Sequence, residues 1–129
     1  MIVDASALVA IVLKEPVWQT LEKALLDSPE NLISPVNRME VFIRLEFIDG
    51  EWLVRKFEAL AAGIGLKTVP LDDEQLALAQ SAFRRFGKGR HKAALNMGDC
   101  FAYALAKAKG QPILFKGNDF IHTDLESAV

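Results

Sequence analysis

Met1-Ile2-Val3-Asp4-Ala5-Ser6-Ala7-Leu8 opens the chain, and this stretch decides how the remaining residues can fold. Three apolar residues run directly into an acid, and a small polar residue and apolar residues at helical spacing follow. This order is typical of a short buried strand that ends at a turn and leads into a helix. Because a strand buried on both faces is continuously apolar, Met1 to Val3 suit the centre of a parallel sheet.

Asp4 stands at the end of this predicted strand, and two interpretations of it are open. In open α/β sheets, ligands bind outside the carboxyl ends of the strands, so Asp4 is well placed for a functional site. Asp is also a common N-cap residue, so Asp4 can equally serve to cap the following helix. The first eight residues do not distinguish the two interpretations. The positions of the other acids in the chain are needed to do so.

The composition limits the class of protein. The 129 residues suffice for one domain with a substantial core and are too few for two, so we expect a single domain over residues 1–129. Hydrophobic residues make up 51% and charged residues 25%, which predicts a globular chain. The formal net charge is only −2, so any binding of nucleic acid must come from a local basic patch.

The cysteine content and the lengths of the apolar segments predict the cellular location of the protein. Cys100 is the only cysteine and cannot form an internal disulfide, which fits a reducing cytosol. No apolar run approaches the ~20 residues that span a bilayer. Asp4 interrupts the first apolar stretch and no basic residue precedes it, unlike in a signal peptide. We therefore expect a soluble, cytoplasmic protein with no membrane partner.

Apolar spacing, capping residues and chain breakers predict alternating strands and helices along the rest of the sequence. After the first strand, strands are expected at residues 31–33, 66–70 and 112–115, and helices at residues 6–14, 17–25, 35–48, 52–61, 72–86 and 98–109. Asp49-Gly50 is predicted to turn the chain, and Gly110 to end the last helix. This order argues for an α/β fold in which helices cover both faces of a parallel sheet.

The predicted helix over residues 35–48 contains an acid among apolar residues. The residues on or beside one stripe of this helix are Val36, Met39, Glu40, Ile43 and Phe47. We expect the stripe to face the core, which places Glu40 on or at the edge of an apolar face. A buried Glu is rare unless it is paired or bound to a cation, so Glu40 is a candidate functional residue.

Four acids share one kind of position relative to the predicted strands. Asp4 follows the first strand and Asp119 follows the last. Asp99 lies in the first turn of the helix before that last strand, and Glu40 lies one to two turns into the helix after the second strand. Taken singly, each acid is more simply interpreted as a helix cap or a solvated charge. If the first and last strands are neighbours, however, all four can converge at the carboxyl edge of the sheet.

Convergence of four carboxylates would require a cation. Carboxylates held within a few ångströms repel one another, and their pKa values rise and become coupled. Mg²⁺ or Mn²⁺ relieves this repulsion, because both ions prefer oxygen ligands. No Cys/His spacing typical of zinc is present. A divalent ion at such a site can polarise a phosphate and neutralise charge during phosphodiester cleavage.

Four segments taken together resemble the PIN-domain ribonucleases, and more narrowly the VapC toxins of bacterial toxin–antitoxin pairs. The segments are Met1–Leu8, Asn37–Val41, Leu95–Ala106 and Leu114–Phe120, with Thr123-Asp124 behind the last. The resemblance covers nearly the whole chain in order and spacing. It implies a three-layer α/β/α sandwich with a central parallel sheet and metal-dependent cleavage of RNA. It also implies a homodimer and inhibition by a small VapB-type antitoxin that places a peptide in the active-site groove.

The resemblance assigns roles to individual residues. Asp4, Glu40, Asp99 and Asp119 fall on the acidic quartet that holds Mg²⁺ or Mn²⁺ in this family. Ser6 matches the small hydroxyl residue that supports the site. The residues that match flanking positions are Asn118 and Asp124. The commonest family sequence has Thr where this chain has Ala5, a mild departure that leaves the acids in place.

A basic stretch covers the end of the predicted helix at residues 72–86 and the loop after it. Its cations are Arg84, Arg85, Lys88, Arg90 and Lys92, and no acid separates them. One interpretation is a flexible rim that holds RNA phosphates and weakens with salt. The other is a solvated helix end and loop, because cations also suit a helix C-terminus. Both remain open, and the family resemblance favours RNA.

Other candidate residues have simpler structural interpretations. We expect His91 and His122 to be surface or loop residues, and Cys100 to be a small core residue rather than a nucleophile. Asn96 either caps the helix that follows or contacts substrate. Core packing, a dimer face and an antitoxin groove are all open for the aromatic residues Trp18, Trp52 and Phe57, with core packing favoured for Phe57.

We predict an endoribonuclease in which a divalent metal assists the attack of water on a phosphodiester of unpaired RNA. One alternative is a catalytically silent PIN-like module that binds RNA or a partner protein; the intact quartet argues against it. A second is a phosphotransfer or receiver-type domain with an acid nucleophile. Ser6 stands where haloacid-type phosphatases need a second acid, and Asp4 lacks the paired acid typical of receivers.

Overall fold

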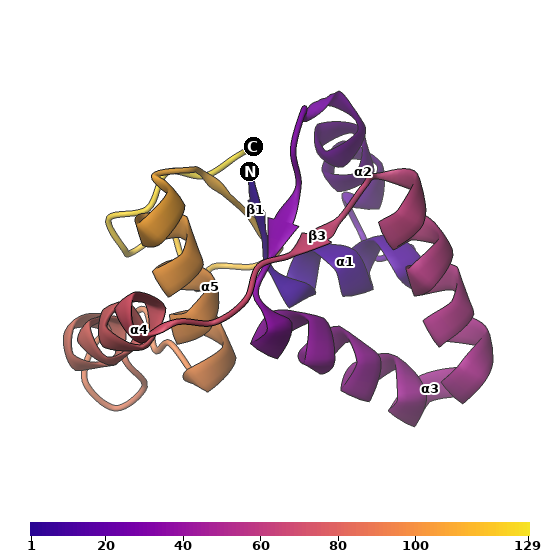
Figure 1. Ribbon diagram of the computed structural model, residues 1–129. Helices are drawn as coiled ribbons and strands as arrows, with labels where there is room; N and C mark the ends of the chain where they lie inside the picture. The colour runs from indigo at the N-terminus through magenta and orange to yellow at the C-terminus, as the bar shows by residue number, and fades with distance from the viewer.

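A parallel four-stranded sheet lies at the centre of the computed structural model, which describes residues 1–129 (Figure 1). The strands are β1 (Ile2–Val3), β2 (Leu32–Ile33), β3 (Lys67–Thr68) and β4 (Ile113–Leu114). Their order in the sheet is β3-β2-β1-β4, and every neighbouring pair is parallel. The predicted parallel sheet is therefore confirmed, although each strand is shorter than the apolar run that predicted it.

The strand order reverses between β1 and β4. The chain adds β2 and β3 on one side of β1 and then places β4 on its other side, with Val3 opposite Leu114. The backbone N–H of Asp4 donates to the carbonyl oxygen of Leu114 at 2.9 Å, which extends this pairing to the strand ends. The first and last strands are thus neighbours, and their carboxyl ends form the switch point where α/β sheets bind ligands.

Five helices cover the two faces of the sheet. They are α1 (Ala5–Val12), α2 (Trp18–Asp27), α3 (Pro35–Gly63), α4 (Asp73–Phe86) and α5 (Met97–Lys109). In Figure 1, α1, α2 and α3 lie on one side of the sheet and α4 and α5 on the other. None of these helices is both long and apolar enough to cross a membrane.

Alternate strand residues face opposite layers, as the pleat of a strand requires. The residues that pack with α1, α2 and α3 are Val3, Ile33 and Leu114. The residues that pack with α4 and α5 are Ile2, Leu32 and Ile113. Each layer therefore has its own apolar cluster against one face of the sheet, and the predicted three-layer α/β/α sandwich is confirmed.

Helix ends follow the capping residues in the sequence. The side chains of Asp4, Ser34, Asp72 and Asn96 each accept a backbone N–H in the first turn of the helix that follows. Gly110 ends α5 in a left-handed conformation with φ of 62°, which glycine adopts without strain. The turn predicted at Asp49-Gly50 is present: both residues have non-helical backbone angles, and α3 consists of two helical segments that meet at a kink there.

The buried stripe predicted for the start of α3 is wrong. Met39 and Phe47 are 54% and 88% exposed, and Ile43 is also exposed. The side chains that face the core are instead Asn37, Val41 and Leu45, which recur at intervals of four residues. The helix has apolar residues on two faces. The face that is buried includes the polar Asn37, so the sequence pattern does not identify it as the core-facing one. The Asn37 amide can be buried because it donates to oxygens of Glu40 and Gly98.

Candidate active site

Asp4 is both a helix cap and a buried acid at the switch point. It is 5% exposed. Its Oδ2 accepts from the backbone N–H of Ser6 at 3.0 Å and from the Ser6 hydroxyl at 2.5 Å. Burial raises the pKa of Asp4, the bonds from Ser6 oppose that rise, and the charge of Asp119 adds to it. The two interpretations of Asp4 therefore do not compete, because one side chain fits both.

Ser6 joins the turns that follow the two neighbouring strands. While its hydroxyl donates to Asp4, its Oγ accepts the backbone N–H of Lys116 at 3.0 Å, and Lys116 lies two residues beyond β4. A small hydroxyl residue is needed here because the group must donate to one turn and accept from the other. Ser6 therefore fixes Asp4 relative to the loop that leads to Asp119.

Asp99 lies at the start of α5 and takes part in a capping box. Its Oδ2 accepts the backbone N–H of Asn96 at 3.0 Å, and its own N–H donates to Asn96 Oδ1 at 2.9 Å. Asp99 is 8% exposed, and burial raises its pKa to about 7. The negative charges of Asp4, Asp119 and Glu40 add to the rise. Asn96 thus serves as the N-cap of α5, one of the two roles left open for it.

Glu40 is half-buried and is held against the start of α5. Asn37 Nδ2 donates to Glu40 Oε1 at 2.8 Å and to the carbonyl oxygen of Gly98 at 2.9 Å. Gly98 is needed here, because a Cβ at this position would lie 2.3 Å from both carboxylate oxygens of Glu40. Burial raises the pKa of Glu40, and the charge of Asp4 contributes. One buried amide therefore connects α3, α5 and the carboxylate between them.

Asp119 lies in the exposed turn after β4, next to Asn118, which is also exposed. Its charge raises the pKa of both Asp4 and Asp99, so Asp119 lies on the same side of the sheet as these acids. Asn118 makes no side-chain hydrogen bond, and its backbone carbonyl accepts from Ile121 at 3.4 Å. The structure thus brings the four predicted acids to one edge, with Asp119 as the most solvent-accessible of them.

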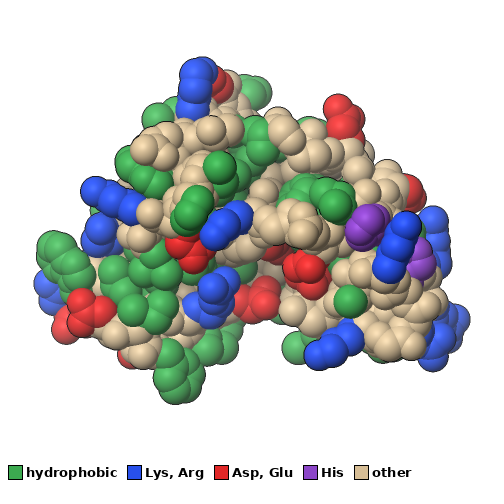
Figure 2. All heavy atoms as spheres, turned by 180° about the vertical axis from the view of Figure 1, so that it is seen from behind, with side chains coloured by type: hydrophobic (Ala, Val, Ile, Leu, Met, Phe, Trp, Pro, Cys, Tyr) green, Lys and Arg blue, Asp and Glu red, His purple; other side chains and the backbone are tan.

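The four acids form no ion pair with a cation, although the charge of Arg44 opposes the rise in the pKa of Glu40. None of the salt bridges in the structure includes Asp4, Glu40, Asp99 or Asp119. In Figure 2, acidic side chains line a hollow between the two lobes of the molecule. No three side chains of the Asp, Glu, His or Cys type are arranged to hold one ion together. The site is therefore an accumulation of negative charge rather than a preformed cage.

The donor chemistry nonetheless fits a hard divalent cation. Mg²⁺ usually keeps several waters and is held by only one or two carboxylates, so a cage of three or more protein ligands is not required. Burial raises the pKa values of Asp4, Glu40 and Asp99, the charge of neighbouring acids adds to each rise, and a bound cation would relieve that repulsion. Four carboxylates form an all-oxygen donor set, whereas zinc sites in proteins are typically built on Cys and His.

Comparison with known proteins identifies the family. The family model of the PIN domain matches residues 1–126. The chain belongs to the PIN-domain family. A protein of Mycolicibacterium smegmatis named ribonuclease VapC is 45% identical over 125 residues, which are 97% of each chain. Ribonuclease VapC30 of Mycobacterium tuberculosis is 41% identical over 97% of this chain and 95% of its own.

A solved structure agrees with the fold of this PIN domain. The crystal structure of Mycobacterium tuberculosis VapC20, described as a toxin that cleaves the sarcin–ricin loop, aligns with a TM-score of 0.77. The alignment covers 96% of this chain and 95% of that one, at 16% sequence identity. Together with the curated relatives, this places the chain among the VapC ribonucleases of the PIN family, as the resemblance in the sequence predicted.

Asp124 lies outside the acidic edge of this PIN domain. It accepts a hydrogen bond from the Tyr103 hydroxyl at 2.7 Å and one from Lys107 Nζ at 3.0 Å. Arg85 lies 3.7 Å away. Burial alone would raise the pKa of Asp124, but the bonds from Tyr103 and Lys107 outweigh it and hold that pKa below its ordinary value. Asp124 therefore anchors the C-terminal segment to the second half of α5.

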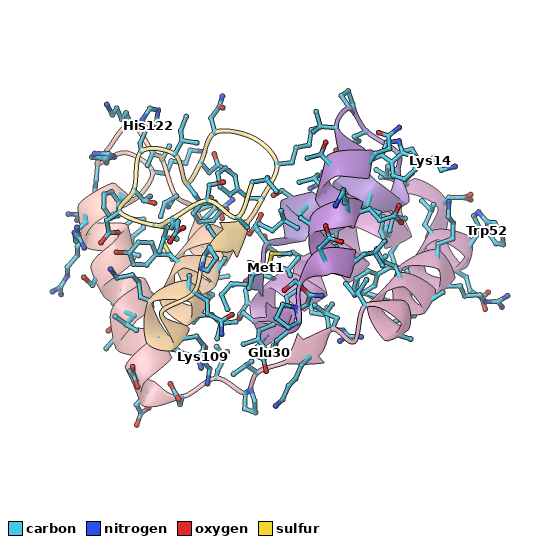
Figure 3. All side chains as sticks on the ribbon, turned by 90° about the horizontal axis from the view of Figure 1, so that it is seen from above. Met1, Lys14, Glu30, Trp52, Lys109 and His122 are labelled. Atoms are coloured by element: carbon cyan, nitrogen blue, oxygen red, sulfur yellow. The ribbon has the colours of Figure 1, made fainter.

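The five cations of the basic stretch differ in their surroundings. Arg85 faces Asp124 and donates to the Tyr103 hydroxyl at 3.2 Å, so it belongs to that anchor. The cations without an acidic partner are Arg84, Lys88, Arg90 and Lys92. His91 accepts the backbone N–H of Ala93 and packs on Phe86, which gives it a structural role in the loop. His122 is exposed, at the edge of the molecule in Figure 3.

Asn37 and Gly98 are site residues that the sequence reasoning missed. Asn37 is fully buried, and its Oδ1 has no hydrogen-bond partner although its Nδ2 has two. A signal was present in the sequence. Asn37 lies four residues before Val41 and three before Glu40, so it shares the buried stripe of α3 and can reach the acid. Gly98, between the cap and Asp99, gave no comparable signal.

Proposed function

We propose that this chain is a metal-dependent endoribonuclease that hydrolyses phosphodiester bonds in unpaired RNA. The observation that supports it most is the group of four carboxylates at the β1/β4 switch point, none of which forms a salt bridge. Burial and the charge of neighbouring acids raise the pKa values of three of them, Asp4, Glu40 and Asp99. The relatives at 40–45% identity are named ribonucleases, in agreement with this chemistry. The enzyme would be a single PIN-like domain over residues 1–129.

Asp4, Glu40, Asp99 and Asp119 would hold the divalent ion, Mg²⁺ or Mn²⁺. When bound there, such an ion supplies Lewis-acid polarisation of the phosphate and neutralises the charge that develops on it. Asp119, being exposed, would be the ligand that the incoming RNA meets first. The buried Asp4 would be the best fixed, because Ser6 binds one of its oxygens twice.

The side chains around the acids would orient them for hydrolysis. In the reaction, water adds to phosphorus while the bond to one ribose oxygen breaks, and the water loses a proton. Asp99 is suited to hold that proton on Oδ1, because its Oδ2 already accepts from Asn96. Asn37 would keep Glu40 beside this group.

The test is cleavage of a fluorescent single-stranded RNA by the purified protein. We expect cleavage with Mg²⁺, none after EDTA, and recovery when Mn²⁺ is added. The Asp4→Asn variant, purified in parallel, should melt at a similar temperature and not cleave, which excludes a contaminating nuclease. Cleavage that ignores the chelator, or that Asp4→Asn retains, would contradict the proposal.

A catalytically silent module is the second candidate. One observation favours it, namely that no three metal-binding side chains are arranged around one point. The same protein preparation distinguishes the two functions. A silent module would bind the fluorescent RNA with Mg²⁺ present and leave it intact, whereas the enzyme would shorten it.

We further infer that the protein is the toxin of a toxin–antitoxin pair, bound by a VapB-type antitoxin and forming a homodimer. Large apolar side chains are exposed along α3, on both sides of the kink at Asp49-Gly50. They are Met39, Phe42, Ile43, Phe47, Ile48 and Trp52, all more than 40% exposed. Trp52 lies at the outer edge of the molecule in Figure 3. Exposed apolar surface of this kind on a small protein is typical of a protein interface.

The partner assignment is tested by co-expression with the product of the adjacent reading frame. We expect a stable complex by light scattering, inhibition of RNA cleavage, and loss of one or both interfaces on Phe47→Asp. A free chain that stays monomeric at micromolar concentration, and a neighbouring product that neither binds nor inhibits, would refute the assignment. The ribonuclease proposal would survive that result.

A further inference from the structure

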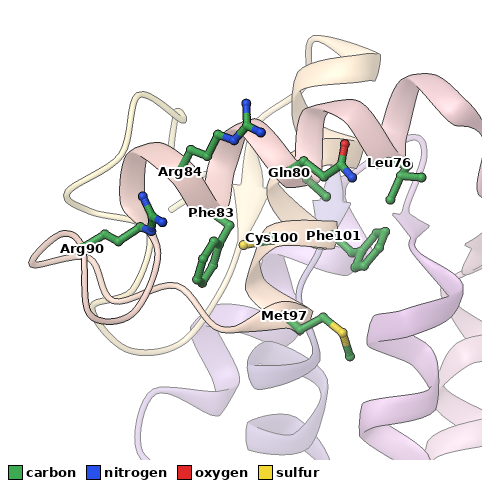
Figure 4. A pocket seen from close by; sticks show the side chains of 9 residues that line it. Leu76, Gln80, Phe83, Arg84, Arg90, Met97, Cys100 and Phe101 are labelled. Atoms are coloured by element: carbon green, nitrogen blue, oxygen red, sulfur yellow. The ribbon is translucent and has the colours of Figure 1, made fainter.

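A cavity of about 510 Å³ lies between α4 and α5, beside the acidic edge (Figure 4). Its volume falls in the range of ligand pockets in proteins. The lining residues discussed below are Leu76, Phe83, Arg84, Arg90, Met97 and Phe101. Leu76 and Phe83 are apolar residues of α4 that line the cavity, and they are 47% and 42% exposed. The apolar face of α4 is therefore open along this cavity.

The chemistry of the cavity suits a flat apolar group joined to an anion. Phe83 and Phe101 present aromatic rings to the cavity, and no acid lines it. Arg84 and Arg90 stand at its rim without a carboxylate partner in the molecule. The Arg90 guanidinium lies 5.6 Å from the ring centroid of Phe83, so an aromatic face and a delocalised cation are already side by side.

The cavity and the acids share the first turn of α5. Met97 and Phe101 point into the cavity, as Figure 4 shows. Asp99 lies between them in sequence and faces Asp4, Asp119 and Glu40 instead. The two sites therefore lie on different faces of the same end of α5, a helix about 10 Å across with its side chains. An RNA chain bound at the acids can extend from there to the cavity.

We propose that this cavity holds one unpaired base of the RNA next to the bond that is cut, with Arg84 and Arg90 bound to the flanking phosphates. The inference rests on the proposed ribonuclease function and adds a specificity site to it. Unpaired bases are commonly recognised by stacking on aromatic rings and on guanidinium planes. Arginines without acidic partners can bind phosphates, and aromatic rings beside them can stack on bases. This combination favours RNA over an apolar peptide as the occupant of the cavity.

The experiment measures RNA binding in the Asp99→Asn background, which cannot cleave but keeps an acceptor for the Asn96 N–H. The probes are fluorescein-labelled 12-nucleotide oligo(A), oligo(C) and oligo(U), and an abasic 12-mer with the same backbone. We expect Phe83→Leu to weaken binding of at least one base-containing oligomer by about fivefold or more, as loss of aromatic stacking does. Binding of the abasic oligomer should not change, because its phosphates are intact.

The arginines are expected to give a different pattern. Arg84→Gln and Arg90→Gln should weaken all four oligomers alike, and each should reduce the salt dependence of log Kd by about one. Leu26→Ala is the control, because Leu26 is a large apolar side chain, 65% exposed and on α2, away from the cavity and the acids. It should leave every Kd unchanged.

Three outcomes would overturn the inference, and they are distinguishable. If Phe83→Leu leaves all Kd values unchanged while the wild type cleaves RNA, the base pocket is refuted and the ribonuclease stands. If Phe83→Leu changes the mass measured by light scattering and not the base dependence, the cavity is a protein interface. If the Asp99→Asn protein binds no oligomer and the wild type cleaves none, the proposed function fails together with the pocket.

Discussion

Two carboxylates packed near α5 have opposite environments. Asp99, at the start of the helix, has no cation beside it, and burial together with three neighbouring acids raises its pKa to about 7. Asp124, beside the second half of the helix, receives bonds from Tyr103 and Lys107 and lies near Arg85, and its pKa is lowered. The same side-chain type is thus unfavourably charged at one end of α5 and well compensated at the other.

This difference separates a functional acid from a structural one. A protein keeps unpaired buried carboxylates at a cost in stability, and such groups cluster at functional sites. An acid with its own donors stabilises the fold and needs no ligand. The sequence resemblance placed Asp99 in the acidic quartet and Asp124 at a flanking position, but it did not show which of them has a cationic partner. Their environments predict different responses to the same substitution.

The largest difference is expected in catalysis. Asp99→Asn should lower the rate of Mg²⁺-dependent RNA cleavage by more than about 1000-fold, because stabilisation by a bound metal contributes several kcal/mol to the transition state. Asp124→Asn should stay within about threefold of the wild type. Initial rates on one fluorescent RNA, with melting temperatures for both variants, measure this. Equal losses in the two variants would erase the distinction.

A smaller loss is expected where the acids are positioned rather than removed. Gly98→Ala places a Cβ against both oxygens of Glu40, so the carboxylate has to move by about 1 Å. Misplacement of that size costs up to about 100-fold in rate. Gly63→Ala is the matched control, because Gly63 ends α3 with open space around it and no positive φ. If the two variants cleave RNA equally well, the contact between Glu40 and α5 has no role in the reaction.

The sequence predicted the frame of the site because local signals determine it. Asp72 and Asn96 stand at the starts of their helices and cap them, and Gly110 ends α5, where only the neighbouring backbone matters. The acids at the strand ends followed from topology, since parallel strands place their carboxyl ends at one edge. These features require no knowledge of which helix faces lie together.

The remaining features depend on contacts between distant segments. The buried face of α3 could not be chosen from periodicity, because apolar residues recur at helical spacing on two faces and the buried one includes Asn37. Only the packing of α5 against α3 shows that the buried Asn37 amide has a hydrogen-bond acceptor, the carbonyl oxygen of Gly98. Likewise, Arg85 and Arg90 look equivalent in the basic stretch, and only the fold pairs one with Asp124 and sets the other over Phe83.

Asp99→Asn should also change the stability of the protein. We expect the substitution to raise the free energy of unfolding although it lowers the rate of RNA cleavage. A carboxyl with a pKa of 3.8 when unfolded and about 7 when folded holds its proton in the folded state between these values. The free energy of unfolding of the metal-free wild type should therefore fall as pH rises from about 4 to 7. Asp99→Asn removes this loss, so at pH 8 the variant should be more stable by about 1–2 kcal/mol after allowance for solvent screening.

Urea titrations of both proteins in EDTA, at pH 4 and pH 8, measure this effect. The two proteins should have similar stability at pH 4, where the carboxyl is protonated in the folded state of the wild type. Mg²⁺ at pH 8 should stabilise the wild type more than the variant, because binding to the folded state adds to its stability. A variant that is less stable at both pH values would mean that the Asp99 charge is compensated in the free protein.

The smallest effect is expected for the stability of Asp124→Asn, and its sign is reversed. The pKa of Asp124 is lowered in the fold, so its contribution is present above the unfolded value near 4 and is lost as pH falls through the lowered folded value. The side chain is 37% exposed, so the loss at pH 7 should be under about 1 kcal/mol. It should shrink with added salt and vanish near pH 2, where the acid is neutral in both states. Urea titrations at these conditions measure it, and a gain in stability at pH 7 would show that Asp124 resembles Asp99 after all.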